Sequence, residues 1–156
     1  MEIQINEQTL ETILIDTQIR IIKSPTAEYI PDSNVGIESI SLDDDYTRID
    51  FVYISPKEYP NVSWVQMHGD SYIRPVGTEN KYKLIRAINI PLAPNKHFFK
   101  KSGQVLKYTL LFPALPKNIK QIDIIEKLVP GPYFNFFRVD IAHGQPLLIT
   151  LNNNQN

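Results

Sequence analysis

The chain contains no cysteine among its 156 residues. This absence excludes disulfide bonds, thiol nucleophiles, C-x-x-C redox chemistry and thiolate metal sites from the chain. No apolar run approaches the roughly 20 residues that a membrane-spanning helix needs, so we expect no membrane insertion. Only six glycines occur, and none lies in a G-x-G or G-K-S/T arrangement, so no phosphate-cradling loop is expected.

Charge is unevenly placed along the chain. Residues 1–50 carry eleven Asp/Glu against three Lys/Arg, whereas residues 51–156 carry six against thirteen. Residues 96–120 hold six lysines and no acidic residue. Either the two halves pair across the fold, or the lysines form a positive patch that faces a polyanion. The pI of about 6.3 and the lack of a recognised motif predict no nucleic-acid binding.

Helical patterns are almost missing, because twelve prolines punctuate the chain. Short runs rich in β-branched and aromatic residues alternate with turn formers, which is typical of strands. Apolar residues alternate along residues 47–55, and an acidic turn at residues 43–46 joins this strand to residues 37–42 as a hairpin. The other predicted strands cover residues 18–24, 62–68, 71–76, 81–90, 105–112, 121–127, 134–141 and 147–151.

Strands of this length and spacing predict an all-β fold, an immunoglobulin-like antiparallel β-sandwich of about 7–10 strands. We expect residues 1–151 to form this single domain and residues 152–156 to be a polar C-terminal tail. Residues 6–16 fit either one short N-terminal helix, capped by Thr9, or a first strand. The predicted core consists of the aromatic residues Phe51, Tyr53, Trp64, Tyr108, Phe112 and Phe136.

Five short motifs follow one another along the chain: KYKL at 81–84, IPL at 90–92, FPALPK at 112–117, IDIIE at 122–126 and FNF at 134–136. Together they resemble, over roughly residues 35–141, a β-sandwich domain of unknown function from Bacteroides-type bacteria. The resemblance implies a domain that stands beside thioredoxin-like or other domains in envelope proteins. It brings no catalytic residues, and the absence of cysteine argues against a redox association.

The expected location depends on where the natural chain begins. The first 16 residues are acidic and lack the basic segment and apolar core of a signal peptide. A cytoplasmic location is expected if Met1 is the natural start. The family resemblance points to the cell envelope or periplasm if the natural chain begins earlier.

Pro113 and Pro116 form a P-x-x-P spacing, which suits either a ligand of proline-binding modules or a corner between strands. Pro113 lacks the amide hydrogen that the interior of a strand needs, and the next predicted strand follows shortly. A polyproline ligand would carry more proline around this pair. We therefore predict a crossing between two strands, with Leu115 tucked under the sandwich.

Catalytic and metal-binding motifs are not found. His68, His97 and His143 are too widely spaced to predict a shared metal site. Residues 43–45 are three consecutive aspartates without a calcium-loop pattern, so a solvated hairpin turn is predicted. No G-x-S-x-G motif occurs, and no pair of carboxylates is placed in a cleft as a glycosidase requires. The sequence predicts no enzyme, no metal site and no cofactor.

Aromatic side chains provide the best candidates for ligand binding. Tyr59, Trp64 and Tyr72 belong to a loop-rich segment, and aromatic faces beside polar groups suit sugar stacking or protein contact. Burial in the core is the alternative for each. The sequence favours a non-catalytic interaction or accessory module with an unknown protein or glycan partner. The alternative is a carbohydrate-binding module that uses exposed aromatics around Trp64.

Overall fold

The computed structural model describes residues 18–31, 34–56 and 63–148, which form thirteen strands and no helix. The strands are β1 (Gln18–Lys23), β2 (Ala27–Tyr29), β3 (Val35–Leu42), β4 (Tyr46–Ile54), β5 (Trp64–Val65), β6 (Tyr72–Pro75), β7 (Tyr82–Lys83), β8 (Arg86–Ile88), β9 (His97–Phe98), β10 (Val105–Pro113), β11 (Gln121–Ile125), β12 (Phe136–Asp140) and β13 (Gln145–Leu148). The described residues contain no helix that could cross a membrane.

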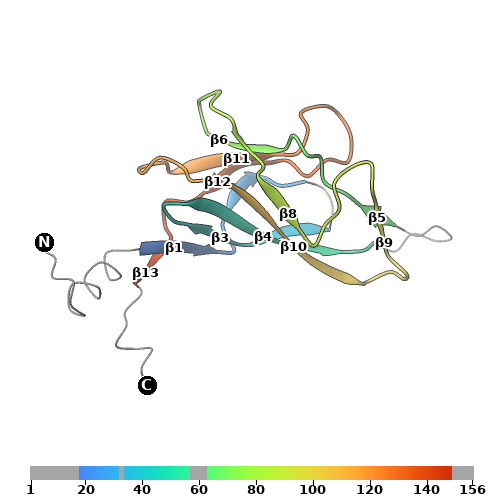
Figure 1. Cartoon of the computed structure of the whole chain (residues 1–156). Helices are drawn as coiled ribbons and strands as arrows, with labels where there is room; N and C mark the ends of the chain where they lie inside the picture. Colours follow the sequence, from blue (N-terminus) through green and yellow to red (C-terminus); the bar gives the residue numbers. More distant parts are fainter. Residues whose placement is uncertain (1–17, 32–33, 57–62, 149–156) are drawn as a thin grey trace, which may run out of the picture.

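Two antiparallel sheets make up most of the molecule (Figure 1). The first sheet has the order β13-β1-β3-β4-β10-β8, and the second has the order β2-β12-β11-β6-β7. Figure 1 shows β6, β11 and β12 as a layer over β1, β3, β4 and β10. The short pair β5–β9 stands at one end of the two layers. This arrangement confirms the all-β prediction and is consistent with a β-sandwich.

Strands β4 and β10 form the centre of the first sheet, and both follow the alternation that the sequence predicts. Ile49, Phe51 and Tyr53 of β4 are buried, and so is Tyr108, which lies opposite Phe51 in the register. The rings of Phe51 and Tyr108 stack with centroids 4.9 Å apart. The buried face of each strand is therefore the face with period-2 hydrophobicity.

Aromatic contacts join the two sheets across the core. The ring of Phe51 in β4 lies 5.9 Å from that of Phe136 in β12, and the ring of Tyr53 lies 5.7 Å from that of Phe134. Phe51 and Phe136 are almost completely buried. These side chains fill the space between the sheets, as the predicted core requires.

One member of the predicted core is misplaced. Trp64 lies on β5, away from the two main sheets, and its side chain is 42% exposed. The other five aromatic residues of that prediction are buried. Hydrophobicity alone placed Trp64 in the core, but its strand pairs only with β9 at the end of the molecule, so one face of this ribbon is left uncovered.

The hairpin prediction for residues 37–55 is confirmed. β3 and β4 pair antiparallel, and the turn between them is fixed by Asp43. Its Oδ1 accepts hydrogen bonds of 2.8 Å from the backbone N–H groups of Asp45 and Tyr46. The first aspartate of the acidic run therefore shapes the turn, as an Asx turn does.

The prediction of one strand over residues 81–90 is wrong. The segment divides into β7, which pairs with β6 in the second sheet, and β8, which pairs with β10 in the first. The change occurs between two neighbouring residues: the N–H of Leu84 donates to the Ser71 carbonyl, and the N–H of Ile85 donates to the Leu111 carbonyl, each at 2.8 Å. Both halves are rich in residues typical of strands, so the sequence pattern does not mark the point where the chain passes from one sheet to the other.

The strand count also exceeds the prediction of 7–10. The short strands β2 and β9 were not predicted, and the predicted strand at residues 62–68 is reduced to β5. The predicted strand at 147–151 is described only to Leu148, as part of β13. Residues 6–16 and the 152–156 tail, and with them the ends of the predicted domain, lie outside the described residues.

The segment between Pro113 and Gln121 is a crossing between the two sheets, as the sequence predicts. Pro113 ends β10, and Gln121 begins β11. The Pro113 carbonyl accepts a hydrogen bond of 3.0 Å from the Thr47 hydroxyl, and Leu115 packs against the core. The P-x-x-P spacing thus lies in the connection between the two sheets.

Candidate functional site

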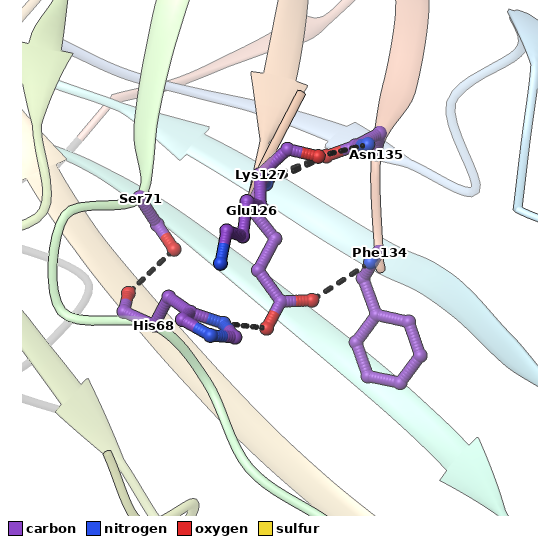
Figure 2. A network of polar contacts seen from close by, with 6 residues as sticks. All are labelled: His68, Ser71, Glu126, Lys127, Phe134 and Asn135. Carbon is purple, nitrogen blue, oxygen red and sulfur yellow. Dashed lines mark hydrogen bonds and ion pairs between the residues drawn. The ribbon is translucent and has the colours of Figure 1, made fainter. Parts of the chain in front are cut away.

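A polar network surrounds Glu126, directly after β11 (Figure 2). Its carboxylate is buried, with Oε2 2.8 Å from Nδ1 of His68. Oε1 accepts a 2.8 Å hydrogen bond from the backbone N–H of Phe134. Both carboxylate oxygens therefore have partners, as a buried acidic group requires.

The segment after β11 is held to the entry of β12 by a second polar side chain. Asn135 Oδ1 accepts hydrogen bonds from the N–H groups of Glu126 and Lys127, at 2.8 and 3.1 Å. Its Nδ2 donates to the Lys127 carbonyl at 2.8 Å. Figure 2 shows Asn135 beside Lys127 and Phe134 beside the Glu126 carboxylate. The Asn135 amide and the Glu126 carboxylate together hold the two ends of the loop over residues 127–133.

A histidine, a carboxylate and a serine occur together in this network, which raises the possibility of a catalytic triad. The Ser71 hydroxyl, however, donates to the backbone carbonyl of His68 at 2.6 Å, as does the Ser71 N–H at 3.1 Å. Ser71 is buried. A triad requires the serine hydroxyl to face the imidazole, so the observed pairing does not have the geometry of an activated nucleophile.

The space beside the network is too small for a substrate. A cavity of about 10 Å³ is lined by Ser71, Tyr108 and Glu126, among others. That volume is close to the minimum for a single water molecule. The Tyr108 hydroxyl is buried without a hydrogen-bond partner among the described residues. Burial, with a smaller effect from Glu126 and Tyr53, raises the pKa of Tyr108 well above its usual value.

The predicted ligand-binding residues have different surroundings. Tyr59 lies outside the described residues. Tyr72 belongs to β6 and is only 8% exposed, with the Lys81 ammonium 4.8 Å from its ring centroid. Trp64 is the member of the set with a substantially exposed ring. The structure does not bring Tyr72 and Trp64 onto one strand pair, since β5 and β6 belong to different sheets.

Trp64 instead has an aromatic neighbour that the sequence analysis missed. It lies directly opposite Phe98 in the β5–β9 register, and Phe98 is 60% exposed. Directly opposed residues of an antiparallel pair point to the same side. Val65 and Phe99, which follow them in sequence, are buried on the other side. The ribbon thus has an inner face in the core and an outer face with two exposed rings.

Lys96 lies on the outer face of the ribbon. Its Nζ is 4.2 Å from the centroid of the Trp64 ring, which is a cation–π distance. Lys96 precedes Phe98 by two residues, so the strand alternation places both on the same face. We call the outer face of the β5–β9 pair, which carries Trp64, Lys96 and Phe98, the aromatic ribbon. The sequence gives no clear signal for Phe98, because two adjacent phenylalanines follow one another and only one of them is buried.

The other histidines do not form a shared site. His143 Nδ1 is 2.6 Å from Asp140 Oδ2 at an exposed position. The hydrogen bond from His143 is the main cause that lowers the pKa of Asp140, with a smaller effect from the Ala142 N–H. The His97 ring contacts the Phe99 ring edge-on. Within residues 18–31, 34–56 and 63–148, no three His, Asp or Glu side chains could hold a metal ion.

Two clefts lie around the crossing between the sheets, away from both regions described above. One, of about 500 Å³, is lined by residues that include Arg20, Asp43 and Leu115. The other, of about 690 Å³, includes Thr78 and His143. Neither includes a residue of the aromatic ribbon or of the Glu126 network.

Comparison with protein families, with curated proteins and with solved structures finds no match to this chain.

Proposed function

We propose that this chain is a non-catalytic binding module on an immunoglobulin-like sandwich, and that its partner contacts the aromatic ribbon. The observation that carries the proposal is the cross-strand pair of Trp64 and Phe98, two large aromatic side chains exposed on one face. Exposed aromatics that adjoin one another are typical of interaction sites, because most large aromatics are otherwise buried in the core.

A second exposed apolar pair adjoins this end of the molecule. Ile54 and Val105 lie opposite each other in the register of β4 and β10, and both are exposed. The loop that leads from β9 to Val105 is fastened beside them, since the Ser55 hydroxyl donates to the Lys101 carbonyl at 2.9 Å. Exposed apolar side chains thus also occur on the neighbouring β4–β10 pair, which favours contact with a partner.

The arrangement of the polar network supports a non-catalytic role. His68, Glu126 and Ser71 satisfy one another and the backbone, and the adjoining cavity of about 10 Å³ has no room for a substrate. Such networks hold loops in place. The resemblance to envelope-associated sandwich domains suggests the same accessory role.

Carbohydrate binding is the second candidate, and the exposure of Trp64 favours it. Indole and phenyl faces stack on the C–H face of a pyranose ring, and a flat platform suits this contact. Trp64 is the single tryptophan of the chain, so its fluorescence reports on the aromatic ribbon directly.

The test combines fluorescence with a glycan array. We expect red-shifted, iodide-quenchable emission from Trp64, and a glycan or protein ligand that protects it from quenching. Phe98→Ala should abolish binding, whereas Tyr29→Ala, which removes an equally exposed ring from β2, should leave it unchanged. If Phe98→Ala binds every ligand as the unmodified chain does, the aromatic ribbon is not the binding site.

A further inference from the structure

The aromatic ribbon carries a positive charge within the aromatic site itself. The Lys96 ammonium lies over the Trp64 ring, and no ion pair to Lys96 occurs among the described residues. Lys100 and Lys101 follow in the adjoining loop, also exposed and without a described ion pair. By contrast, Lys107 on β10 is paired with Glu38 at 3.2 Å.

On the β9 side of the site, this positive charge has no acidic residue near it in sequence. No Asp or Glu occurs between Glu79 and Asp123, a span that includes both β9 and β10. The aromatic ribbon therefore combines exposed rings with a cation that has no ion pair among the described residues, and a ligand that uses both must offer an anionic group close to an apolar face.

From this combination we propose that the aromatic ribbon binds an acidic polysaccharide whose pyranose rings carry a carboxylate. The inference rests on the carbohydrate candidate above and specifies the class of sugar. The C–H face of a hexuronate stacks on Trp64 or Phe98, while its ring carboxylate reaches the ammonium of Lys96. A neutral sugar would use the rings and leave the charge unpaired.

An acidic peptide is the competing ligand, and the backbone around β5 favours the polysaccharide. A peptide that binds as an added strand needs a free sheet edge. The backbone groups of this segment that face β9 and the residues before it are taken: the Phe99 N–H donates to the Ser63 carbonyl, and Met67 exchanges hydrogen bonds with residues 91 and 93. β5 and β9 have two residues each, which leaves little edge for a peptide.

The experiment is a fluorescence titration of the full chain with oligogalacturonate. The matched ligand is the same oligosaccharide with its carboxylates methyl-esterified, which removes the charge and keeps the sugar rings. We expect the ester to bind about five-fold more weakly, the effect of one exposed ion pair of about 1 kcal/mol. Affinity for the acid should fall with added salt, and that for the ester should not.

Two lysine variants test whether Lys96 is the residue that contacts the sugar carboxylate. Lys96→Gln should weaken binding of the acid about five-fold and weaken binding of the ester by a clearly smaller factor. Lys83→Gln removes an exposed lysine on β7 and should change neither affinity. Hexaglutamate tests the competing ligand and should bind more weakly than the oligogalacturonate, because it has no pyranose face for the rings.

The outcomes separate the two proposals. Equal binding of acid and ester, or no effect of Lys96→Gln, overturns the acidic-sugar inference and leaves the carbohydrate candidate in place. Hexaglutamate binding as tightly as the oligogalacturonate overturns it in favour of recognition of charge alone. If neither oligosaccharide binds, the inference is wrong, and the Phe98→Ala comparison on protein ligands still decides whether the aromatic ribbon is an interaction surface.

Discussion

Trp64 and His68 are four residues apart in sequence, but they belong to regions with opposite character. His68 meets the buried carboxylate of Glu126, and each polar atom of that carboxylate has a partner. Trp64 lies on a ribbon whose outer face is exposed in the described structure, with the Lys96 ammonium against its ring. Side chains that the sequence marks as functional candidates thus stabilise the fold in one region and are exposed to solvent in the other.

The sharpest way to test this contrast is within the ribbon itself, at two adjacent phenylalanines. Phe99 is 2% exposed and packs its ring 5.5 Å from that of Tyr53, whereas Phe98 faces outward. We expect Phe99→Ala to lower the free energy of unfolding by about 4 kcal/mol and Phe98→Ala by less than about 0.5 kcal/mol. Urea denaturation measures both. Similar losses of unfolding free energy for the two variants would show that Phe98 is packed as Phe99 is, so that the β5–β9 pair has no exposed face.

The next largest effect is expected at Asp123, a second buried acidic residue on β11. Its carboxylate accepts hydrogen bonds of 3.0 Å from Arg74 Nε and from the Arg138 N–H, at a bulge between β11 and β12. Asp123→Ala leaves the Arg74 charge without its buried partner, so unfolding free energy should fall by about 3 kcal/mol. Asp44→Ala, at an exposed turn, is the control and should cost almost nothing. A loss at Asp123 below 1 kcal/mol would contradict a structural role.

Glu126→Gln changes the polar network with little change in shape. The amide can still accept from the Phe134 N–H, but the charge-assisted contact with His68 is lost, so we expect a loss of about 2 kcal/mol. Glu79→Gln is the matched control, because Glu79 is highly exposed and lies 3.6 Å from Arg74. The same urea series measures both. If Glu126→Gln left stability unchanged but abolished ligand binding, this network would have a functional role and not a structural one.

The smallest effect concerns pH at Asp50, on the outer face of the first sheet. Burial raises its pKa, but hydrogen bonds from Thr109, Arg48 and Ser39 outweigh burial, and the net pKa is below the usual 3.8. A lowered folded-state pKa contributes stability above the unfolded value and loses it as pH falls through the folded value. The difference in unfolding free energy between Asp50→Asn and the unmodified chain should therefore be present at pH 7 and shrink below about pH 4. A difference independent of pH would contradict it.

Local pattern accounts for much of what the sequence predicted correctly. The hairpin of β3 and β4 follows from a short alternating segment and an Asx turn, both encoded within a few residues. The proline crossing is equally local, because Pro113 cannot continue a ladder of hydrogen bonds. The split of residues 81–90 was not predictable, since Leu84 and Ile85 have similar strand propensities and differ only in which sheet lies beside them.

The amino-acid sequence by itself determined the strand-rich composition, the exclusion of thiol chemistry and the aromatic residues from which a core or a binding surface could be made. Which aromatic serves which purpose was decided only by tertiary structure. Trp64 and Phe51 are both large apolar residues on strands, but the second sheet covers Phe51, whereas no sheet covers the outer face of β5 in the described structure and Trp64 stays 42% exposed. Side-chain burial depends on strands that are distant in sequence, and local hydrophobicity does not record their position.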